Sequence, residues 1–363
     1  MLYRKYRPQN FSEIIGQEHI VKTLTNSLVA KSIAHAYLFG GPKGSGKTTI
    51  ARIFAKAINC TDFSSFEPCN KCLSCQEIMA SKSLDLIEID AASHTSVDHV
   101  RELVEGTRFL PVKSKYKIFI IDECHQLSKS AANALLKTLE EPPPHVIFIL
   151  ATTETHKMIP TIVSRCQRFD FRRLKTSEII KKMEFILNKE KIKFESSVLH
   201  LLAINAHGSL RDAESLLDKC ITFTAGDKSI TVKEVKDFLG IVEVSQIAKL
   251  VDLILSKKTK TAIEFLNSMV ESGADLQEFA KAAVFYLRQC LLFKVDRPLL
   301  NQNHTGFSDE EIEKIRFQTE HLTEKEIQKM LELFIEAENK MKYASILQLP
   351  LELAIIDLTY KEL

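Results

Sequence analysis

Long apolar stretches are absent from this sequence, and none approaches the roughly 18 residues that a helix needs to cross a bilayer. The first eight residues also lack the apolar core of a signal peptide. No internal period suggests a repeat architecture, and no low-complexity tail is present. These absences argue against a membrane protein or a solenoid, and they predict a cytoplasmic protein.

A large net charge is also missing, because the 363 residues sum to only +2. Residues 1–172 hold 22 Lys and Arg against 17 Asp and Glu, a balance of +5, and the remainder holds 27 against 30, a balance of −3. This asymmetry permits an anionic partner for the first part but does not require one. A hydrophobic content of 45% is typical of a globular chain, and the length suggests two or three domains.

Glycine is scarce, with 11 residues, yet four of them lie between positions 40 and 46. They follow an apolar run, 37–39, that predicts a buried strand, and they precede a helical pattern at 50–58. Loop amides and a helix dipole in this setting attract phosphate oxygens. The segment fits the phosphate-loop pattern G-x-x-x-x-G-K-[ST] and reads Gly41, Pro42, Lys43, Gly44, Ser45, Gly46, Lys47, Thr48, Thr49.

This motif predicts a magnesium–nucleotide site. Lys47 would neutralise the β- and γ-phosphates of ATP, and the Thr48 hydroxyl would ligate Mg²⁺. The alternative is a glycine-rich turn before a core helix. The presence of Lys-Thr in register with the glycines favours the nucleotide site.

Two adjacent carboxylates follow another apolar run, residues 117–121. Asp122 could hold the magnesium, and Glu123 could orient a water and take its proton for attack on the γ-phosphate. Thr153, after the apolar run 146–150, could report whether the γ-phosphate is present, or could simply end its strand. Arg165 in Ser-Arg-Cys has the pattern of a surface residue unless something lies opposite it.

Four of the eight cysteines lie together, with the spacing C-x8-C-x2-C-x2-C. Four thiolates can close a tetrahedral shell around zinc, and two-residue spacers suit neighbouring ligands. Such bunching in a cytosolic chain favours a metal over disulfides. An iron–sulfur cluster or unligated thiols remain alternatives. The candidate ligands are Cys60, Cys69, Cys72 and Cys75.

Two further stretches, one at the start of the chain and one after residue 176, contain candidate residues for the nucleotide site. Tyr6 and Arg7 could pack against a nucleotide base, or could belong to an arm held by ordinary packing. From about residue 176 the pattern changes to amphipathic helices, at 177–191, 197–206 and 209–223. Arg211 opens the last of these, where the helix dipole opposes a cation, so a compensating anion such as phosphate is expected.

With these motifs in place, the chain resembles the AAA+ ATPases, and among them the gamma/tau family of bacterial DNA polymerase III clamp loader subunits. The resemblance covers the whole chain. It rests on the phosphate loop, the cysteine spacing, the Asp-Glu pair and six further motifs at residues 3–8 (Tyr-Arg-Lys-Tyr-Arg-Pro), 16–19 (Gly-Gln-Glu-His), 89–93 (Ile-Asp-Ala-Ala-Ser), 150–153 (Leu-Ala-Thr-Thr), 164–166 (Ser-Arg-Cys) and 208–213 (Gly-Ser-Leu-Arg-Asp-Ala).

The resemblance implies three domains. Residues 1–172 would form a RecA-like α/β domain with a parallel sheet and a zinc-binding insertion at 60–75. Residues 173–240 would form a small all-helical lid, and residues 241–363 an all-helical collar for oligomerisation. It also implies that Thr153 and Arg211 are the sensor-1 and sensor-2 residues, and that Arg165 is a finger that reaches the ATP of a neighbouring subunit.

The implied function is that of an ATP-hydrolysing motor in the DNA polymerase III holoenzyme, at the nucleoid. It would open the ring-shaped sliding clamp, beta, and place it on primer–template DNA, together with delta, delta-prime and further gamma/tau copies. Two alternatives remain: another AAA+ machine, such as a helicase loader or branch-migration motor, and a non-hydrolysing scaffold subunit. His94 departs from the basic residue expected after Ala-Ala-Ser, which would weaken a contact with template phosphates at neutral pH.

Overall fold

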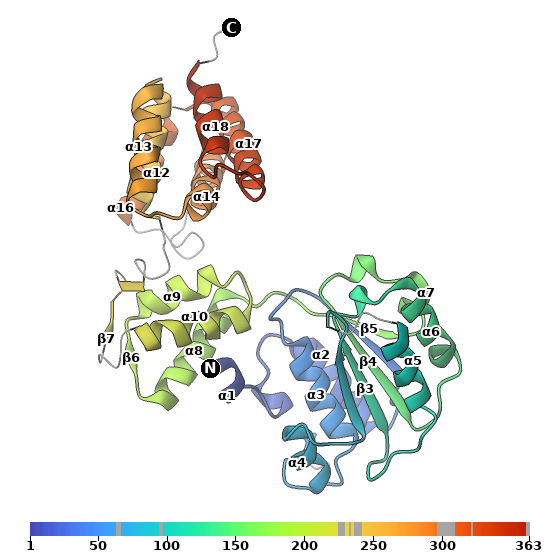
Figure 1. The fold of residues 1–363 in the computed structure, drawn as a ribbon. Coiled ribbons are helices and arrows are strands. Elements are labelled where there is room, and N and C mark those ends of the chain that lie inside the picture. The colour runs from blue at the N-terminus through green and yellow to red at the C-terminus, as the bar shows by residue number, and fades with distance from the viewer. Residues whose placement is uncertain are drawn as a thin grey trace. The chain divides into compact units, whose positions relative to one another are not determined.

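The computed structural model describes residues 1–62, 67–93, 97–223, 229–231, 234–235, 242–295, 309–320 and 322–360 (Figure 1). The chain divides into two compact units, Met1–Ser229 and Ile230–Leu363. His94 and the expected lid boundary at residue 240 lie outside the described residues.

The first unit is built on a five-stranded parallel sheet with the order β2-β3-β4-β1-β5. Register pairs Gly40 with Thr152 and Asp90 with Asp122. The carboxyl ends of β1, β3 and β4 therefore meet at one edge, where parallel sheets place their sites. The strands are β1 (Ala36–Gly40), β2 (Leu86–Asp90), β3 (Lys117–Asp122), β4 (Val146–Thr152) and β5 (Gln167–Asp170), followed by the short β6 (Lys193–Phe194) and β7 (Ser229–Ile230).

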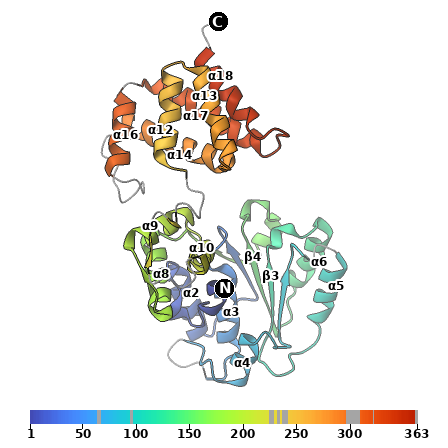
Figure 2. The same cartoon turned by 60° about the vertical axis from the view of Figure 1, so that its left-hand side comes forward.

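Helices cover both faces of this sheet (Figures 1 and 2). Alternate residues of β3 show why: Ile118 and Ile120 pack in the same core as α2 and α3, and Phe119 and Ile121 pack in the core that includes α5 and α6. The confirmed class is an α/β sandwich of three layers. Its helices are α1 (Leu2–Lys5), α2 (Glu18–Val29), α3 (Lys47–Ile58), α4 (Leu73–Met79), α5 (Val97–Gly106), α6 (Lys129–Glu140) and α7 (Pro160–Val163), with 3₁₀ turns η1 (Phe11–Glu13), η2 (Cys124–Gln126) and η3 (Thr155–Lys157).

A small helical layer completes the first unit. It consists of α8 (Thr176–Glu190), α9 (Ser196–Asn205) and α10 (Leu210–Phe223), close to the predicted ranges. Helix α1, from the start of the chain, packs against α10. The chain's first residues and its helical lid are therefore in direct contact.

From residue 242 on, the described elements of the second unit are all helices, as predicted. Its core is mainly apolar and includes a buried polar link in which the Tyr286 hydroxyl donates to Gln318 Oε1 (2.5 Å) and Gln318 Nε2 donates to the carbonyl of Ala248 (2.7 Å). No helix in the described ranges is both long and apolar enough to span a bilayer. The helices are α12 (Val244–Leu255), α13 (Thr259–Glu271), α14 (Leu276–Val295), α16 (Asp309–Glu320), α17 (Glu324–Met341) and α18 (Leu349–Tyr360).

Candidate functional site

The glycine loop joins the buried strand β1 to helix α3 and takes a conformation that needs glycine. Gly46 caps α3 with a φ of 97°, and Gly44 has a φ of 74°. A Cβ at Gly44 would collide with the side chain of Ser209 in the lid. The amide of Leu210 donates to the Gly44 carbonyl (3.2 Å). The loop is therefore in contact with the first turn of α10.

Lys47 lies under this loop and is only 5% exposed. Its Nζ donates to the carbonyls of Gly41 (2.8 Å) and Pro42 (2.9 Å). Burial lowers the pKa of Lys47, and the nearby carboxylates of Glu123 and Asp122 oppose that shift. The ammonium group is thus held at the base of the loop, beside the acidic residues of β3.

The Thr48 hydroxyl donates to Asp122 Oδ2 (2.7 Å). The other carboxylate oxygen, Oδ1, accepts from the amide of Glu123 (3.0 Å). A hydroxyl and a carboxylate in contact at a phosphate loop are the oxygen ligands that Mg²⁺ takes in nucleotide sites. The pair joined here is the one that the sequence predicted as the magnesium ligands.

Glu123 occupies a left-handed backbone conformation, with a φ of 48° and a ψ of 41°. A non-glycine residue rarely adopts this region, and such residues are concentrated at functional sites. Its Oε2 accepts from the Thr153 hydroxyl (2.8 Å) and from the Thr153 amide (3.2 Å). The end of β4 therefore holds the carboxylate that follows β3.

His125 is also part of this network. Its Nδ1 lies 2.9 Å from the Thr152 hydroxyl and 3.4 Å from Glu123 Oε2. Its Nε2 lies 3.1 Å from Glu154 Oε2. The sequence signal that could have placed His125 in the site is its position two residues after Glu123, because the tight turn η2 brings its side chain back toward the strand ends.

Arg7 approaches the loop from the start of the chain. Its Nε donates to the Thr49 hydroxyl (3.1 Å) in the first turn of α3. Burial, followed by the positive charge of Arg52, lowers the pKa of Arg7 to about 10, so it stays protonated at neutral pH. Arg211 adds to this repulsion, and its guanidinium lies 5.1 Å from the ring centroid of Tyr3.

Tyr6 contacts the lid. Its hydroxyl donates to Glu190 Oε1 (2.7 Å), and its ring packs edge-on against Phe185 with centroids 6.4 Å apart. These contacts place Tyr6 between the start of the chain and α8. Stacking on a nucleotide base stays a prediction.

Arg165 follows α7, and its contacts are with neighbouring residues of α6 and α7. It donates to Glu140 Oε1 (2.5 Å), to the Thr161 carbonyl (2.8 Å) and to the Ser164 hydroxyl (3.3 Å). The Arg165 side chain remains one-third exposed. Among the contacts given for the described residues, none joins it to the glycine loop or to Asp122 and Glu123.

The four predicted cysteines converge beside α3, with all four Sγ atoms within 4.8 Å of one another. Cys69 Sγ and Cys75 Sγ are 4.0 Å apart. A tetrahedral site with Zn–S bonds of about 2.3 Å requires sulfur atoms about 3.8 Å apart. Amides of Cys69 and Cys72 point at the preceding sulfurs (both 3.3 Å), which stabilises thiolates. The residues present therefore fit a closed structural zinc site.

A cavity of about 390 Å³ borders the glycine loop, between Pro42, Lys43 and lid residues that include His207 and Asp212. A second cavity, of about 670 Å³, extends from Asp122 along β2, and its lining includes the positive charge of Arg52 and the negative charges of Glu88 and Asp90. Open space therefore exists beside the loop and, separately, beside Asp122.

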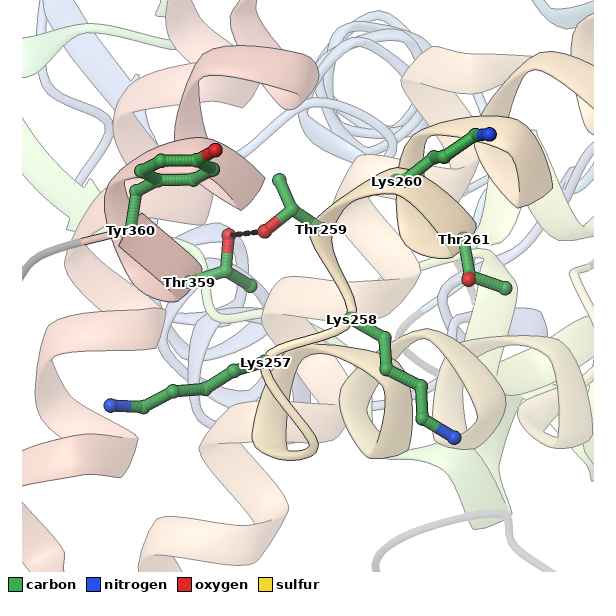
Figure 3. A pocket seen from close by; sticks show the side chains of 7 residues that line it. All are labelled: Lys257, Lys258, Thr259, Lys260, Thr261, Thr359 and Tyr360. Carbon is green, nitrogen blue, oxygen red and sulfur yellow. Dashed lines mark hydrogen bonds between the residues drawn. The ribbon is translucent and has the colours of Figure 1, made fainter.

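A further cavity of about 550 Å³ lies in the second unit, between the start of α13 and the end of α18 (Figure 3). A hydrogen bond joins the hydroxyls of Thr259 and Thr359 (2.8 Å). The side chains of Lys257, Lys258 and Lys260 point in different directions (Figure 3). Because the three ammonium groups do not converge, this cavity lacks the geometry of a phosphate site.

Comparison with protein-family models divides the chain into three matches. Residues 16–175 match "DNA polymerase III, delta subunit", and residues 178–226 match "DNA polymerase III clamp loader subunit, ATPase lid domain". Residues 230–363 match "DNA polymerase III subunits gamma and tau domain III". Solved structures that resemble this chain weakly include a clamp loader delta protein of Bacillus subtilis (16% identity, TM-score 0.38, 94% of this chain and all of the other) and a Thermotoga maritima RuvB (17% identity, TM-score 0.48, 74% of this chain and 86% of the other).

Relatives by sequence are named as tau or gamma subunits of DNA polymerase III. DNA polymerase III subunit tau of Bacillus subtilis is 42% identical over 98% of this chain and 62% of its own length, and that of Escherichia coli is 43% identical over 76% and 42%. DNA polymerase III subunit gamma of Buchnera aphidicola, from Acyrthosiphon pisum, is 43% identical over 77% of this chain and 76% of its own length. The chain thus spans about three-fifths or less of the two tau proteins. These relatives do not favour a helicase loader or a branch-migration motor, and the chain belongs to the gamma/tau family of DNA polymerase III clamp loader subunits.

Proposed function

We propose that this chain is a Mg²⁺-dependent ATPase that drives a clamp loader, opening the sliding clamp and placing it on primer–template DNA in the bacterial cytoplasm. The observation that carries the proposal is the meeting of Lys47, the Thr48–Asp122 pair and the Glu123–Thr153 pair at one edge of the sheet. This set supplies a phosphate cation, metal ligands and a base, which are the parts that ATP hydrolysis needs.

Each side chain then has a role. The amides of residues 41–49 and the dipole of α3 bind the phosphates, and Lys47 neutralises them. Thr48 and Asp122 hold Mg²⁺, which draws charge from the γ-phosphate. Glu123 takes the proton of the attacking water once Thr153 turns toward the γ-phosphate.

Residues of the lid and of the start of the chain complete the ATP site. Arg211 contributes a cation from α10, and Tyr6 and Arg7 face the base and sugar side of the nucleotide. Residues 1–172, 173–240 and 241–363 act as the ATPase domain, its lid and the collar. Arg165 leaves Glu140 and completes the site of a neighbouring subunit, where DNA binding aligns it.

The complete set of residues also bears on the scaffold alternative. A non-hydrolysing subunit can dispense with the phosphate-loop lysine or the metal carboxylate, and this chain keeps Lys47, Asp122 and Glu123 in mutual reach. The proposal is therefore an active motor.

This function is tested by measuring ATP turnover first with the chain alone and then with its partners added. The chain alone is expected to hydrolyse ATP slowly, and a mixture with delta, delta-prime and beta is expected to do so quickly only when primed DNA is present. If turnover is stimulated only in that complete mixture, the ATP sites are shared between subunits, as proposed. High turnover in the chain alone, unchanged by beta, would reject the clamp as its substrate.

The cysteine cluster is proposed to hold one structural Zn²⁺. The purified chain is expected to contain about one equivalent of zinc by mass spectrometry, and Cys75→Ser is expected to lose most of it because three thiolates leave the shell open. Cys166→Ser, outside the cluster, is the control. Iron with sulfide in place of zinc, or no metal, would contradict this assignment.

Assembly is proposed to use an exposed apolar stripe on α18. The side chains of Leu349, Leu353, Ile356 and Tyr360 follow a 4-3-4 spacing along the helix and are 43%, 50%, 37% and 73% exposed. That spacing forms a seam for a second helix. We expect the helical unit of another clamp loader subunit to cover it.

Leu353→Asp is expected to weaken assembly at least tenfold, because a charge in a helix seam must be desolvated. Analytical ultracentrifugation with delta and delta-prime measures it. Asp357→Asn changes a charge on the same helix and serves as the control. Unchanged assembly of the Leu353 variant would place the subunit contacts elsewhere.

A further inference from the structure

The first thirteen residues, called here the N-terminal arm, run from the lid to the cysteine cluster. At its start the arm is attached to α8: Lys5 Nζ donates to Glu190 Oε1 (2.6 Å), and Lys182 Nζ donates to the carbonyl of Tyr6 (3.2 Å). The amino group of Met1 lies 3.7 Å from Asp218 Oδ2 on α10. The arm is therefore bound to two lid helices.

The middle of the arm lies on α3, the helix that begins at the glycine loop. Arg7 reaches Thr49 there. Four residues before the cysteine cluster begins, Lys56 donates its Nζ to the carbonyl of Gln9 (2.6 Å) while itself only 2% exposed. A buried ammonium bonded to a backbone carbonyl fixes the position of that carbonyl.

The end of the arm is held by the segment that contains the cysteines. Glu67 accepts two backbone hydrogen bonds, from the Phe11 amide to Oε2 and from the Ser12 amide to Oε1, both 2.7 Å long. Asn70 adds a third link, because its Nδ2 donates to Asn10 Oδ1 (2.6 Å). Glu67 and Asn70 flank Cys69, so the cluster fixes both of them.

One carboxylate thus caps two amides at the start of the 3₁₀ turn η1. The amides there have no partner within the turn, and bonds to a charged acceptor are about twice as strong as neutral ones. The Phe11 side chain, anchored in the core with α2 and α3, sets the direction of the chain at this point.

Arg7 has few contacts of its own beside the glycine loop. It is partly buried, the charges of Arg52 and Arg211 repel it, and the carboxylates of Glu88 and Asp122 attract it. Its single side-chain partner among the described contacts is the Thr49 hydroxyl. The other contacts of the arm, at its two ends and at Lys56, therefore help to keep Arg7 in this position.

We propose that the cysteine segment is an anchor for the N-terminal arm, and that Glu67 is a positioning residue for nucleotide binding because it holds Arg7 beside the glycine loop. This inference rests on the proposed ATP site. It gives the cysteine cluster a role in nucleotide affinity as well as in local folding.

The test compares Glu67→Ala and Glu67→Gln with the unaltered full chain. Glu67→Ala is expected to raise the dissociation constant of a fluorescent ATP analogue about tenfold, since two charge-assisted bonds are lost. Glu67→Gln keeps the side-chain volume and one acceptor oxygen, so a smaller increase is expected. Turnover at saturating ATP should change less than twofold, because the hydrolytic residues are untouched.

Glu77→Gln is the matched control, since Glu77 lies on the same segment and its carboxylate pairs with Lys113 (2.7 Å), away from the arm. Zinc content should stay unchanged in all variants. Hydrogen exchange at the Phe11 and Ser12 amides should quicken in Glu67→Ala and not in Glu77→Gln.

The outcomes distinguish failure of the proposed ATP site from failure of the inference about Glu67. If the unaltered chain binds no ATP analogue, the proposed ATP site fails and this inference fails with it. If the unaltered chain binds and Glu67→Ala binds equally well, only the inference is overturned. Unchanged amide exchange in Glu67→Ala would likewise overturn it, whether or not nucleotide is present.

Discussion

Replacing Arg165 with alanine is expected to lower DNA-stimulated ATP turnover by about 10³- to 10⁵-fold while leaving ATP binding intact, the range that arginine fingers contribute. The position of Arg165 explains this expectation. In the single chain the guanidinium is engaged by Glu140 and Thr161, and no described contact brings it to the chain's own glycine loop. Its loss should therefore remove charge stabilisation at a neighbour's γ-phosphate and spare the binding of ATP.

A mixing experiment separates action in trans from action in cis. Arg165→Ala and Lys47→Ala should each be inactive in the assembled loader. Mixed together, they should recover turnover, because the Lys47 variant supplies its arginine to the intact loop of the Arg165 variant. Arg168→Ala, which loses only an exposed pair with Asp170, is the control. No recovery on mixing would place the arginine in its own subunit's site or in none.

Replacing Glu123 with glutamine is expected to lower turnover by about 10²- to 10⁴-fold, the range of general base catalysis, with ATP affinity changed less than threefold. An amide cannot take the proton of the attacking water. It can still accept the hydrogen bond of Thr153, so the local structure should persist. Single-turnover hydrolysis and equilibrium binding measure the two quantities.

The control for that change is Glu105→Gln, an exposed residue on α5. Its turnover should match that of the unaltered chain. Turnover in Glu123→Gln within fivefold of normal would show that another group takes the proton, and His125 would be the next residue to replace.

Apolar runs and the glycine motif predicted most of the sheet because they depend on local sequence. Strands β1, β3 and β4 are the apolar runs that the sequence predicted, each extended by one or two residues, and the Thr48–Asp122 contact joins two recognised motifs. Strand β5 was missed. It reads Gln-Arg-Phe-Asp, and only Phe169 is buried, because an edge strand pairs on one side and stays in contact with water on the other.

The remaining features depend on contacts between distant residues. Helix α4 lies in the polar cysteine segment, where no apolar period indicates a helix. Tyr6 contacts Glu190 across 184 positions, and Phe11 contacts Glu67 across 56. No local pattern encodes these pairs, so the arm could be predicted as basic and aromatic but not as a bridge between the lid and the cysteines.

The sheet order has a consequence for biosynthesis. Strand β1, with all five residues buried, is complete at residue 40, yet its two partners are β4 and β5, which end at residues 152 and 170. At about 5 to 20 residues per second, a ribosome needs roughly 6 to 25 s to make the intervening chain. Until β4 and then β5 are made, this buried strand has unpaired edges, the kind of surface that chaperones cover and that aggregates when it is left bare.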